Sequence, residues 1–188
     1  ELQAHESVRE RLLSPEIPPM TFIDTAGCGY SEKVDPETLS TYNEEEARLL
    51  LQHLSDTVEA LGTERIFEER LEIGVIAPYR AQTKVLTERF EDFEVLKQVR
   101  EYITIDTVDA FQGRERDIIY ISLVRSNNEG VIGFLADERR MNVAMTRAKM
   151  RLVMIGDSAT LGSNYFYNKI LDYVQEIGAY QSAFELIT

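Results

Sequence analysis

The sequence predicts an α/β domain with a mainly parallel β-sheet that is covered by helices on both faces. Three observations predict this fold class. Apolar runs of strand length alternate with segments of helical periodicity along the chain. The 188 residues, 44% of them hydrophobic, suffice for one large domain with a substantial core. The least ordinary residues come just after expected strands, at the edge where parallel sheets bind their ligands.

The prolines, the glycines and the alternation of apolar and polar residues indicate the first elements. Residues 1–20 contain three prolines and no clear period, so we expect a short leader there. Residues 20–25 alternate in the manner of a strand. The glycines and the proline within residues 26–39 then predict a loop.

The first helix is expected to follow Asn43. Asparagine is a good N-cap, and the three acids of residues 44–46 lie in the first turn, where the helix dipole favours negative charge. We expect these acids to face solvent. Apolar residues at helical spacing continue the helix to Leu61, and Gly62 ends it.

The same criteria predict the remaining elements. Residues 73–77 are apolar throughout, which indicates a strand buried on both faces. Further strands are expected at 102–105, 117–124 and 151–156, and further helices at 82–90, 137–146 and 164–177.

Composition excludes several classes of protein. No apolar run approaches the roughly 20 residues of a membrane helix, and the N-terminus lacks the basic and apolar parts of a signal peptide. We therefore expect an intracellular, cytoplasmic protein without a membrane partner. One cysteine and two histidines argue against a disulfide and against a metal site, so we expect no metal ligands in the chain.

The net charge of −13 argues against binding a polyanion, but the charge is unevenly distributed. Residues 114–151 contain eight basic side chains and five acidic ones, which gives this window a charge of +3. The rest of the chain carries −16, mostly in acidic runs that are typical of solvated helix surfaces. Any binding of nucleic acid by this chain is therefore expected to be weak and sensitive to salt.

Two segments carry chemistry suited to phosphates. After the third strand, Thr107 offers a hydroxyl, Gly113 permits close backbone approach, and Glu115 provides acceptors for hydroxyl groups. Each of these residues alone is equally compatible with a helix cap, a turn or a surface acid. Arg139 and Arg147 lie four residues on either side of Val143, so their guanidinium groups line one side of the next helix, and arginine suits bidentate contact with phosphates.

The same segments resemble motifs of superfamily 1 helicases of the nonsense-transcript regulator type. The sequence TVDAFQGRERD at residues 107–117, followed by VRSN at 124–127, resembles motif V and its extension. The sequence RRMNVAMTRAK at residues 139–149 resembles motif VI, and IAPYRAQ at residues 76–82 resembles motif IV. The three motifs follow the order of the family, and together they are far more specific than motif IV alone.

This resemblance implies a three-layer RecA-like domain of the P-loop NTPase type, the C-terminal one of two that face each other across an ATP cleft. It implies that Arg147 is the catalytic arginine finger, which reaches the γ-phosphate. The resemblance implies five ATP-binding residues: Gln112, Gly113, Glu115, Arg140 and Arg147. It implies seven residues that face a single strand of DNA or RNA: Ala77, Pro78, Tyr79, Thr107, Val108, Arg125 and Ser126.

The sequence departs from the family by lacking the elements of the other motor half. It holds no Gly-x-x-x-x-Gly-Lys-Ser/Thr phosphate loop, no Asp-Glu pair for magnesium, and no tyrosine-arginine segment for the adenine. We therefore expect residues 1–188 to be cut from a longer protein. The expected cofactors are ATP and Mg²⁺, with the magnesium ligands in the N-terminal RecA-like domain of the same parent chain. The family branch implies movement from 5′ to 3′.

Two alternatives belong to other functional classes. A degenerate helicase half kept as a noncatalytic protein-interaction module is expected to have lost the motif VI arginines, but Arg140 and Arg147 are both present. A stand-alone nucleotide-binding or nuclease domain is disfavoured by the missing phosphate loop and by the lack of a clustered metal-binding triad. The sequence leaves open whether the strand is DNA or RNA.

We expect the 188-residue chain to hydrolyse ATP no faster than buffer, with or without single strands. The reason is that its sequence provides neither a phosphate loop nor a carboxylate pair for magnesium. Release of inorganic phosphate by the purified chain measures this. Robust turnover that single strands stimulate would contradict the assignment to half a motor.

Overall fold

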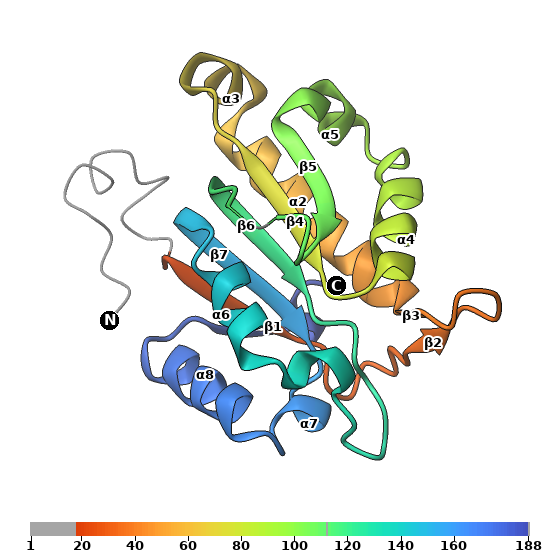
Figure 1. Ribbon diagram of the computed structural model, residues 1–188. Coiled ribbons are helices and arrows are strands. Elements are labelled where there is room, and N and C mark those ends of the chain that lie inside the picture. The colour runs from red at the N-terminus through yellow and green to blue at the C-terminus, as the bar shows by residue number, and fades with distance from the viewer. Residues whose placement is uncertain (1–17, 112, 188) are drawn as a thin grey trace.

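Six parallel strands form the centre of the protein, as a computed structural model that describes residues 18–111 and 113–187 shows (Figure 1). The strand order in the sheet is β5-β4-β6-β7-β1-β8, and every pair of neighbours is parallel. The strands are β1 (Met20–Asp24), β4 (Ile73–Ala77), β5 (Ile103–Thr107), β6 (Arg116–Ser122), β7 (Ala148–Gly156) and β8 (Tyr180–Ser182). Because all strands are parallel, their carboxyl ends meet at one edge of the sheet.

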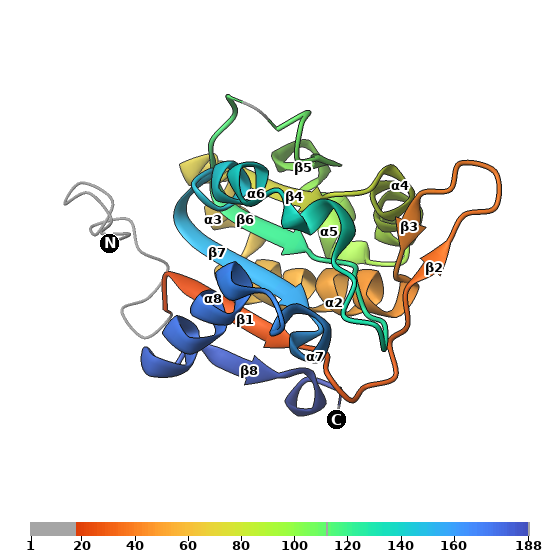
Figure 2. The ribbon, with the colours of Figure 1, turned by 60° about the horizontal axis from the view of Figure 1, so that its bottom comes forward.

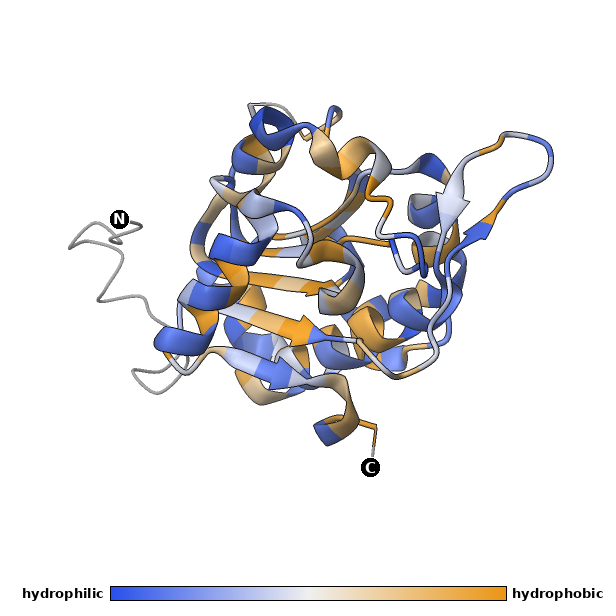
Figure 3. Ribbon diagram, turned by 90° about the horizontal axis from the view of Figure 1, so that it is seen from below, coloured by the Kyte–Doolittle hydropathy of each residue, from blue (hydrophilic) through white to orange (hydrophobic). Residues whose placement is uncertain are grey.

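Helices cover both faces of this sheet, which confirms the predicted three-layer α/β architecture (Figure 2). One face carries α2 (Glu44–Leu61), α3 (Thr63–Glu69), α4 (Arg80–Phe90) and α5 (Glu94–Gln98). The other face carries α6 (Glu138–Met145), α7 (Ser158–Leu161) and α8 (Tyr165–Glu176). Figure 3 shows the apolar strands enclosed between these layers, whose outer surfaces are largely hydrophilic. No helix in the described residues is both long and apolar enough to cross a membrane.

The local sequence explains the longest elements. All five residues of β4 are buried, as expected for a strand covered on both sides. Asn43 caps α2, because its side chain accepts a hydrogen bond from the amide of Glu46 at 3.0 Å. Leu50, Leu54 and Val58 follow at spacings of four residues and bury the inner side of this helix completely.

Short elements and element ends differ from the sequence prediction. Part of the expected loop pairs as a hairpin of β2 (Lys33–Val34) and β3 (Thr41–Tyr42), which projects beyond the body of the molecule in Figure 2. The helices α3, α5 and α7, the strand β8 and the 3-10 turns η1 (Arg100–Tyr102), η2 (Gly133–Ala136) and η3 (Ala183–Glu185) were not predicted. Their three to seven residues are too few to display a period. Residues 1–17 of the expected leader lie outside the described residues.

The predicted and observed ends of β6 also differ, next to residues that were expected to face nucleic acid. The prediction extended this strand to Val124, but the sheet pairing ends at Ser122. Leu123 and Val124 are fully buried, so their apolar character reflects burial in a turn rather than pairing in a sheet. The strand β7, by contrast, begins three residues earlier than predicted, at Ala148.

The glycine in the middle of β4 lets a neighbouring segment approach the sheet. A Cβ atom at Gly74 would lie 2.6 Å from Cδ1 of Ile119 and 2.8 Å from Cε1 of Phe111. Phe111 belongs to the segment between β5 and β6, and its side chain is buried. The missing side chain of Gly74 therefore allows this segment to pack onto the sheet.

We expect Gly74→Ala to lower the free energy of unfolding by about 1–3 kcal/mol, because the added methyl group overpacks the core. Urea unfolding monitored by circular dichroism measures the change. Ile119→Val removes the nearest methyl group, so its combination with Gly74→Ala should cost less than the sum of the two single variants. Additive costs would contradict the proposed clash.

Candidate functional site

The residues expected to face nucleic acid gather at the carboxyl edge of the sheet. Ala77 ends β4, Thr107 ends β5, and Arg125 follows β6. The amide of Val108 donates to the carbonyl of Ala77 at 3.2 Å, and Nη1 of Arg125 donates to the hydroxyl of Tyr79 at 3.1 Å. The structure therefore brings together residues from motif IV, motif V and the extension of motif V, which are up to 48 positions apart in sequence.

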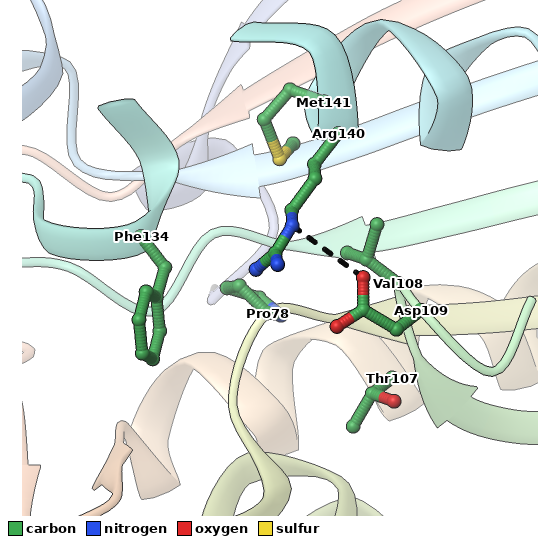
Figure 4. Close-up of a pocket in the computed structure, with 7 residues that line it drawn as sticks. All are labelled: Pro78, Thr107, Val108, Asp109, Phe134, Arg140 and Met141. Atoms are coloured by element: carbon green, nitrogen blue, oxygen red, sulfur yellow. Dashed lines mark ion pairs between the residues drawn. The ribbon is translucent and has the colours of Figure 1, made fainter. Parts of the chain in front are cut away.

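A hollow opens on this edge and is lined from four segments (Figure 4). Arg140 from α6 reaches across it toward Asp109, and its Nε lies 3.5 Å from that carboxylate and 3.3 Å from the carboxylate of Asp137. The lining residues are Pro78, Thr107, Val108, Asp109, Phe134, Arg140 and Met141. The lining of this small hollow combines one arginine and one aspartate with apolar side chains, so it offers a guanidinium and an apolar surface to a ligand.

Several of the expected contact residues have buried side chains. Ala77 is completely inaccessible, and Tyr79 and Val108 are nearly so. The hydroxyl of Tyr79 accepts hydrogen bonds from Arg125 and, at 3.3 Å, from the amide of Phe134. These residues shape the edge, while Pro78, Thr107 and Arg140 line the accessible hollow.

Arg125 and Ser126 are tied to other parts of the protein. Nε of Arg125 lies 2.8 Å from Oε2 of Glu32, and only 12% of the Arg125 side chain is exposed. The amide of Ser126 and the side-chain amide of Asn127 donate to the same Glu32 oxygen. The hydroxyl of Ser126 also donates to Asp157 at 2.8 Å. The guanidinium of Arg125 is therefore largely committed to an internal ion pair.

The backbone between β6 and Arg125 is strained. Val124 has a φ of +70°, which is rare for a β-branched residue. The amide of Arg125 donates to the carbonyl of Leu123 at 2.7 Å and closes a γ-turn around Val124. Such a conformation costs about 1–3 kcal/mol and persists only where its surroundings hold it in place.

Glu46 supplies the contact that holds this turn. Its Oε1 accepts a hydrogen bond from the amide of Val124 at 2.8 Å and another from the hydroxyl of Ser122 at 2.5 Å. The side-chain amide of Asn43 donates to the carbonyl of Val124 at 3.3 Å, so both peptide groups of the valine are bonded to α2 or its cap. Gln82 on α4 joins the network by donating to Ser122 at 2.9 Å.

Glu46 is fully buried, so the expectation that all three acids of residues 44–46 face solvent is wrong for this residue. Desolvation by burial raises the pKa of its carboxyl from 4.5 to about 7, although the hydrogen bonds from Ser122 and Val124 oppose this rise. Its Oε2 has no hydrogen-bond partner among the described residues. The sequence contained one sign of this burial, because Glu46 precedes the buried Leu50 and Leu54 by one and two helical turns.

The residues expected at the nucleotide lie near the opposite edge. Gly113 and Glu115 precede β6, and Arg147 precedes β7. The residues with the least ordinary chemistry were expected just after strands, at the carboxyl edge. This expectation is wrong for Gly113, Glu115 and Arg147, which lie just before β6 and β7. The amide of Arg116 donates to the carbonyl of Arg147 at 2.9 Å, which brings Glu115 and Arg147 close together. The predicted nucleotide contact Gln112 lies outside the described residues.

Helix α6 connects the two edges. Its first turns carry Arg140 beside Asp109, and the chain reaches Arg147 just after its end. Eight residues of α-helix span about 12 Å, so Arg140 lies at one end of this face of the sheet and Arg147 lies at the other. Arg140 was predicted to bind nucleotide with Arg147, but in the structure it lines the hollow of the nucleic-acid candidates.

The side chain of Arg147 is partly buried just before β7. Its Nε is buried and has no hydrogen-bond partner in the described part of the chain. Gly113 nearby has a φ of +79°, a conformation that glycine adopts without strain. Among the described residues, no group of three Asp, Glu, His or Cys side chains is placed to hold a metal ion.

Comparisons with known proteins find relatives of this chain. A family model described as an AAA domain matches residues 1–159. The chain is 36% identical over 197 residues to DNA-binding protein SMUBP-2 of Rattus norvegicus, in an alignment that covers 100% of the chain and 19% of that protein. It is 41% identical over 145 residues to DNA polymerase alpha-associated DNA helicase A of Saccharomyces cerevisiae, with 76% of the chain and 20% of that protein covered.

A third relative is archaeal. The chain is 36% identical over 159 residues to an uncharacterized ATP-dependent helicase of Methanocaldococcus jannaschii, in an alignment that covers 85% of the chain and 21% of that protein. The chain thus spans about a fifth of the length of the curated relatives it matches.

We expect Glu46 to make stability depend on pH. Because the pKa of Glu46 is raised in the folded protein, the folded state binds its proton more tightly than the unfolded state does. The stabilisation is complete below about pH 4.5 and is lost as the pH rises through about 7. Glu46→Gln should remove this dependence, which amounts to on the order of 3 kcal/mol across the window.

Urea unfolding of the wild-type protein and of Glu46→Gln from pH 4 to pH 8 measures the difference. Glu45→Gln is the matched control, because Glu45 is the adjacent residue on α2 and its side chain is 44% exposed. The control should retain the wild-type profile. Parallel profiles for the wild type and Glu46→Gln would show that the carboxyl of Glu46 does not titrate in this range.

Proposed function

Because this chain belongs to the AAA domain family and is the C-terminal domain of a superfamily 1 helicase, we propose that it acts as the second motor half of an ATP-dependent helicase. In this role it supplies an arginine finger and part of the surfaces that bind nucleotide and single strands. The observation that carries the proposal is the position of Arg147, whose buried Nε has no partner among the described residues and which lies beside Glu115 at one edge of the sheet.

The proposed catalytic role of Arg147 follows from the chemistry of phosphoryl transfer. Negative charge spreads over the γ-phosphate oxygens as the bond to the leaving group loosens, and a guanidinium from the second domain stabilises that charge. An arginine already paired with a carboxylate would have to break that pair first. Glu115 and Gly113 contribute a hydroxyl acceptor and close backbone approach to the nucleotide, and Gln112 completes the proposed set.

The partner across the ATP cleft is proposed to be the N-terminal RecA-like domain of the same parent chain. That domain is proposed to contribute the phosphate loop and the carboxylates that hold Mg²⁺, because neither occurs in this sequence. ATP therefore binds between the two halves.

The carboxyl edge of the sheet is proposed to bind the single strand. Pro78, Thr107 and Arg140 are accessible there, whereas Tyr79, Arg125 and Ser126 fix the shape of the edge through internal hydrogen bonds. Two of the relatives carry DNA in their names, so we propose DNA as the first substrate to test and RNA as its competitor. Movement from 5′ to 3′ and a cytoplasmic location stay predictions.

We expect Arg147→Ala in the parent protein to abolish unwinding and to lower ATP turnover on the order of 10³-fold or more, because the finger acts on the transition state. Nucleotide affinity should change little. Arg147→Lys should restore little activity, since an ammonium cannot reproduce the planar guanidinium. Turnover, nucleotide affinity and melting temperature are measured on the same preparation.

Arg139→Ala is the matched control for this variant. Arg139 lies on α6, which ends just before Arg147, and it is exposed. The control should retain most of the turnover. If Arg147 served only to anchor its helix, Arg147→Ala would lower the melting temperature and keep its activity per folded molecule. A stable Arg147→Ala variant with near-normal turnover would exclude the finger assignment.

A further inference from the structure

Phe134 is an aromatic residue that the structure exposes beside the hollow instead of burying it. Fifty-nine per cent of its surface is accessible, although its neighbours Ile132 and Leu135 belong to the core. Burying a phenylalanine side chain typically stabilises a protein by about 1.5–3 kcal/mol, and most of that stabilisation is absent here. The ring of Phe134 is therefore available to a ligand at the hollow that it lines.

The backbone that carries Phe134 is held rigidly. Its amide donates to the hydroxyl of Tyr79 at 3.3 Å, and the carbonyl of Leu135 accepts a hydrogen bond from Tyr167 at 2.8 Å. Gly133 packs so closely on the guanidinium of Arg125 that a Cβ atom there would collide with Nη1. The ring is thus exposed from a fixed turn, so presenting it to a ligand costs little conformational entropy.

The surroundings of the ring suit a flat aromatic ligand with attached phosphates. The centroid of the Phe134 ring lies 5.3 Å from that of the Tyr79 ring, at an interplanar angle of 35°, so a second aromatic ring supports it from within the protein. Figure 4 shows Phe134 on one side of the hollow, Val108 and Asp109 on the other, and Arg140 between them. Half of the Arg140 side chain is exposed, and its Nε lies 3.5 Å from Asp109 and 3.3 Å from Asp137, so a phosphate at this guanidinium competes with two solvent-exposed carboxylates.

The charge of the wider depression differs from that of the chain. Three cationic residues, Arg80, Lys84 and Arg140, line it together with three acids, whereas acids outnumber cations by 33 to 20 in the whole sequence. One of those acids, Asp35, already accepts hydrogen bonds from the backbone amides of residues 37 and 38. The acidic excess that repels a polyanion elsewhere is therefore absent around Phe134.

We propose that Phe134 is a base-stacking residue, on which one unstacked base of a single strand rests while Arg140 faces the neighbouring phosphate. The proposal rests on the proposed function, because it identifies a contact within the single-strand surface. A base stacked on an aromatic side chain is recognised by its π-face, so this contact accepts any of the four bases. Phe134 thus adds a contact that is independent of charge to a chain whose net charge opposes binding.

The absence of tryptophan from the sequence permits a direct test. Phe134→Trp introduces a single tryptophan at the proposed contact, which is excited selectively over the nine tyrosines, and Phe184→Trp introduces one at a matched control position. Phe184 also lies in a 3-10 turn and is 57% exposed, but its turn follows β8 at the opposite side of the sheet. Both variants are titrated at low salt with a short oligothymidylate and with an abasic strand of the same length.

We expect the oligothymidylate to quench the fluorescence of Phe134→Trp and not that of Phe184→Trp, while the abasic strand leaves both unchanged. Phe134→Ala should lower the affinity of the chain for the oligothymidylate about tenfold or more without changing its melting temperature, and Phe184→Ala should not. Quenching of Phe134→Trp by the abasic strand, or wild-type affinity in Phe134→Ala, would overturn the stacking proposal and leave single-strand binding intact. If neither the wild-type chain nor any variant bound either strand, both the proposed binding of single strands and this inference would be wrong.

Discussion

Two hydrogen bonds accepted by the carboxyl of Glu46 hold the chain where it leaves β6, and the carboxyl edge of the sheet is arranged around that point. They stabilise a positive φ at Val124, and this turn directs Arg125 toward Glu32 and Tyr79. Tyr79 in turn fixes the amide of Phe134. A buried acidic group at the start of α2 thereby determines the geometry of three loops that come from distant parts of the sequence.

The sheet separates two kinds of chemistry that the sequence places in one continuous stretch. Thr107 lies at the carboxyl edge of the sheet and Glu115 lies at the start of β6, and α6 runs along the same face. The proposed strand contacts therefore lie at one end of this face and Arg147 lies at the other. One rigid layer bears both surfaces, so a movement of this domain relative to a partner domain displaces both surfaces together.

The sequence predicted long elements well because their periodicity extends over many residues. Asn43 and the helix after it, the apolar strand at 73–77 and the layered α/β architecture are all confirmed. The hairpin of β2 and β3 and the short helices lacked such a signal. Glu46 was predicted to face solvent because it is charged, although its position in the helix places it on the same side as the buried leucines. Its hydrogen bond with Val124 joins residues that are 78 positions apart, so no local pattern predicts it. The motif residues were identified by resemblance, but their distribution over two edges required the structure.

Gly133 shows how closely this edge is fitted together. Only a hydrogen atom fits between its Cα and the guanidinium of Arg125, and the hydroxyl of Tyr79 lies nearby as well. Arg125 is itself bonded to Glu32, which also accepts from Ser126 and Asn127. A side chain at position 133 would have to displace groups from several loops at once. Single substitutions at position 133 are thus a poor route for reshaping this edge during evolution or design, and coordinated replacement of the contacting loops is the more accessible one.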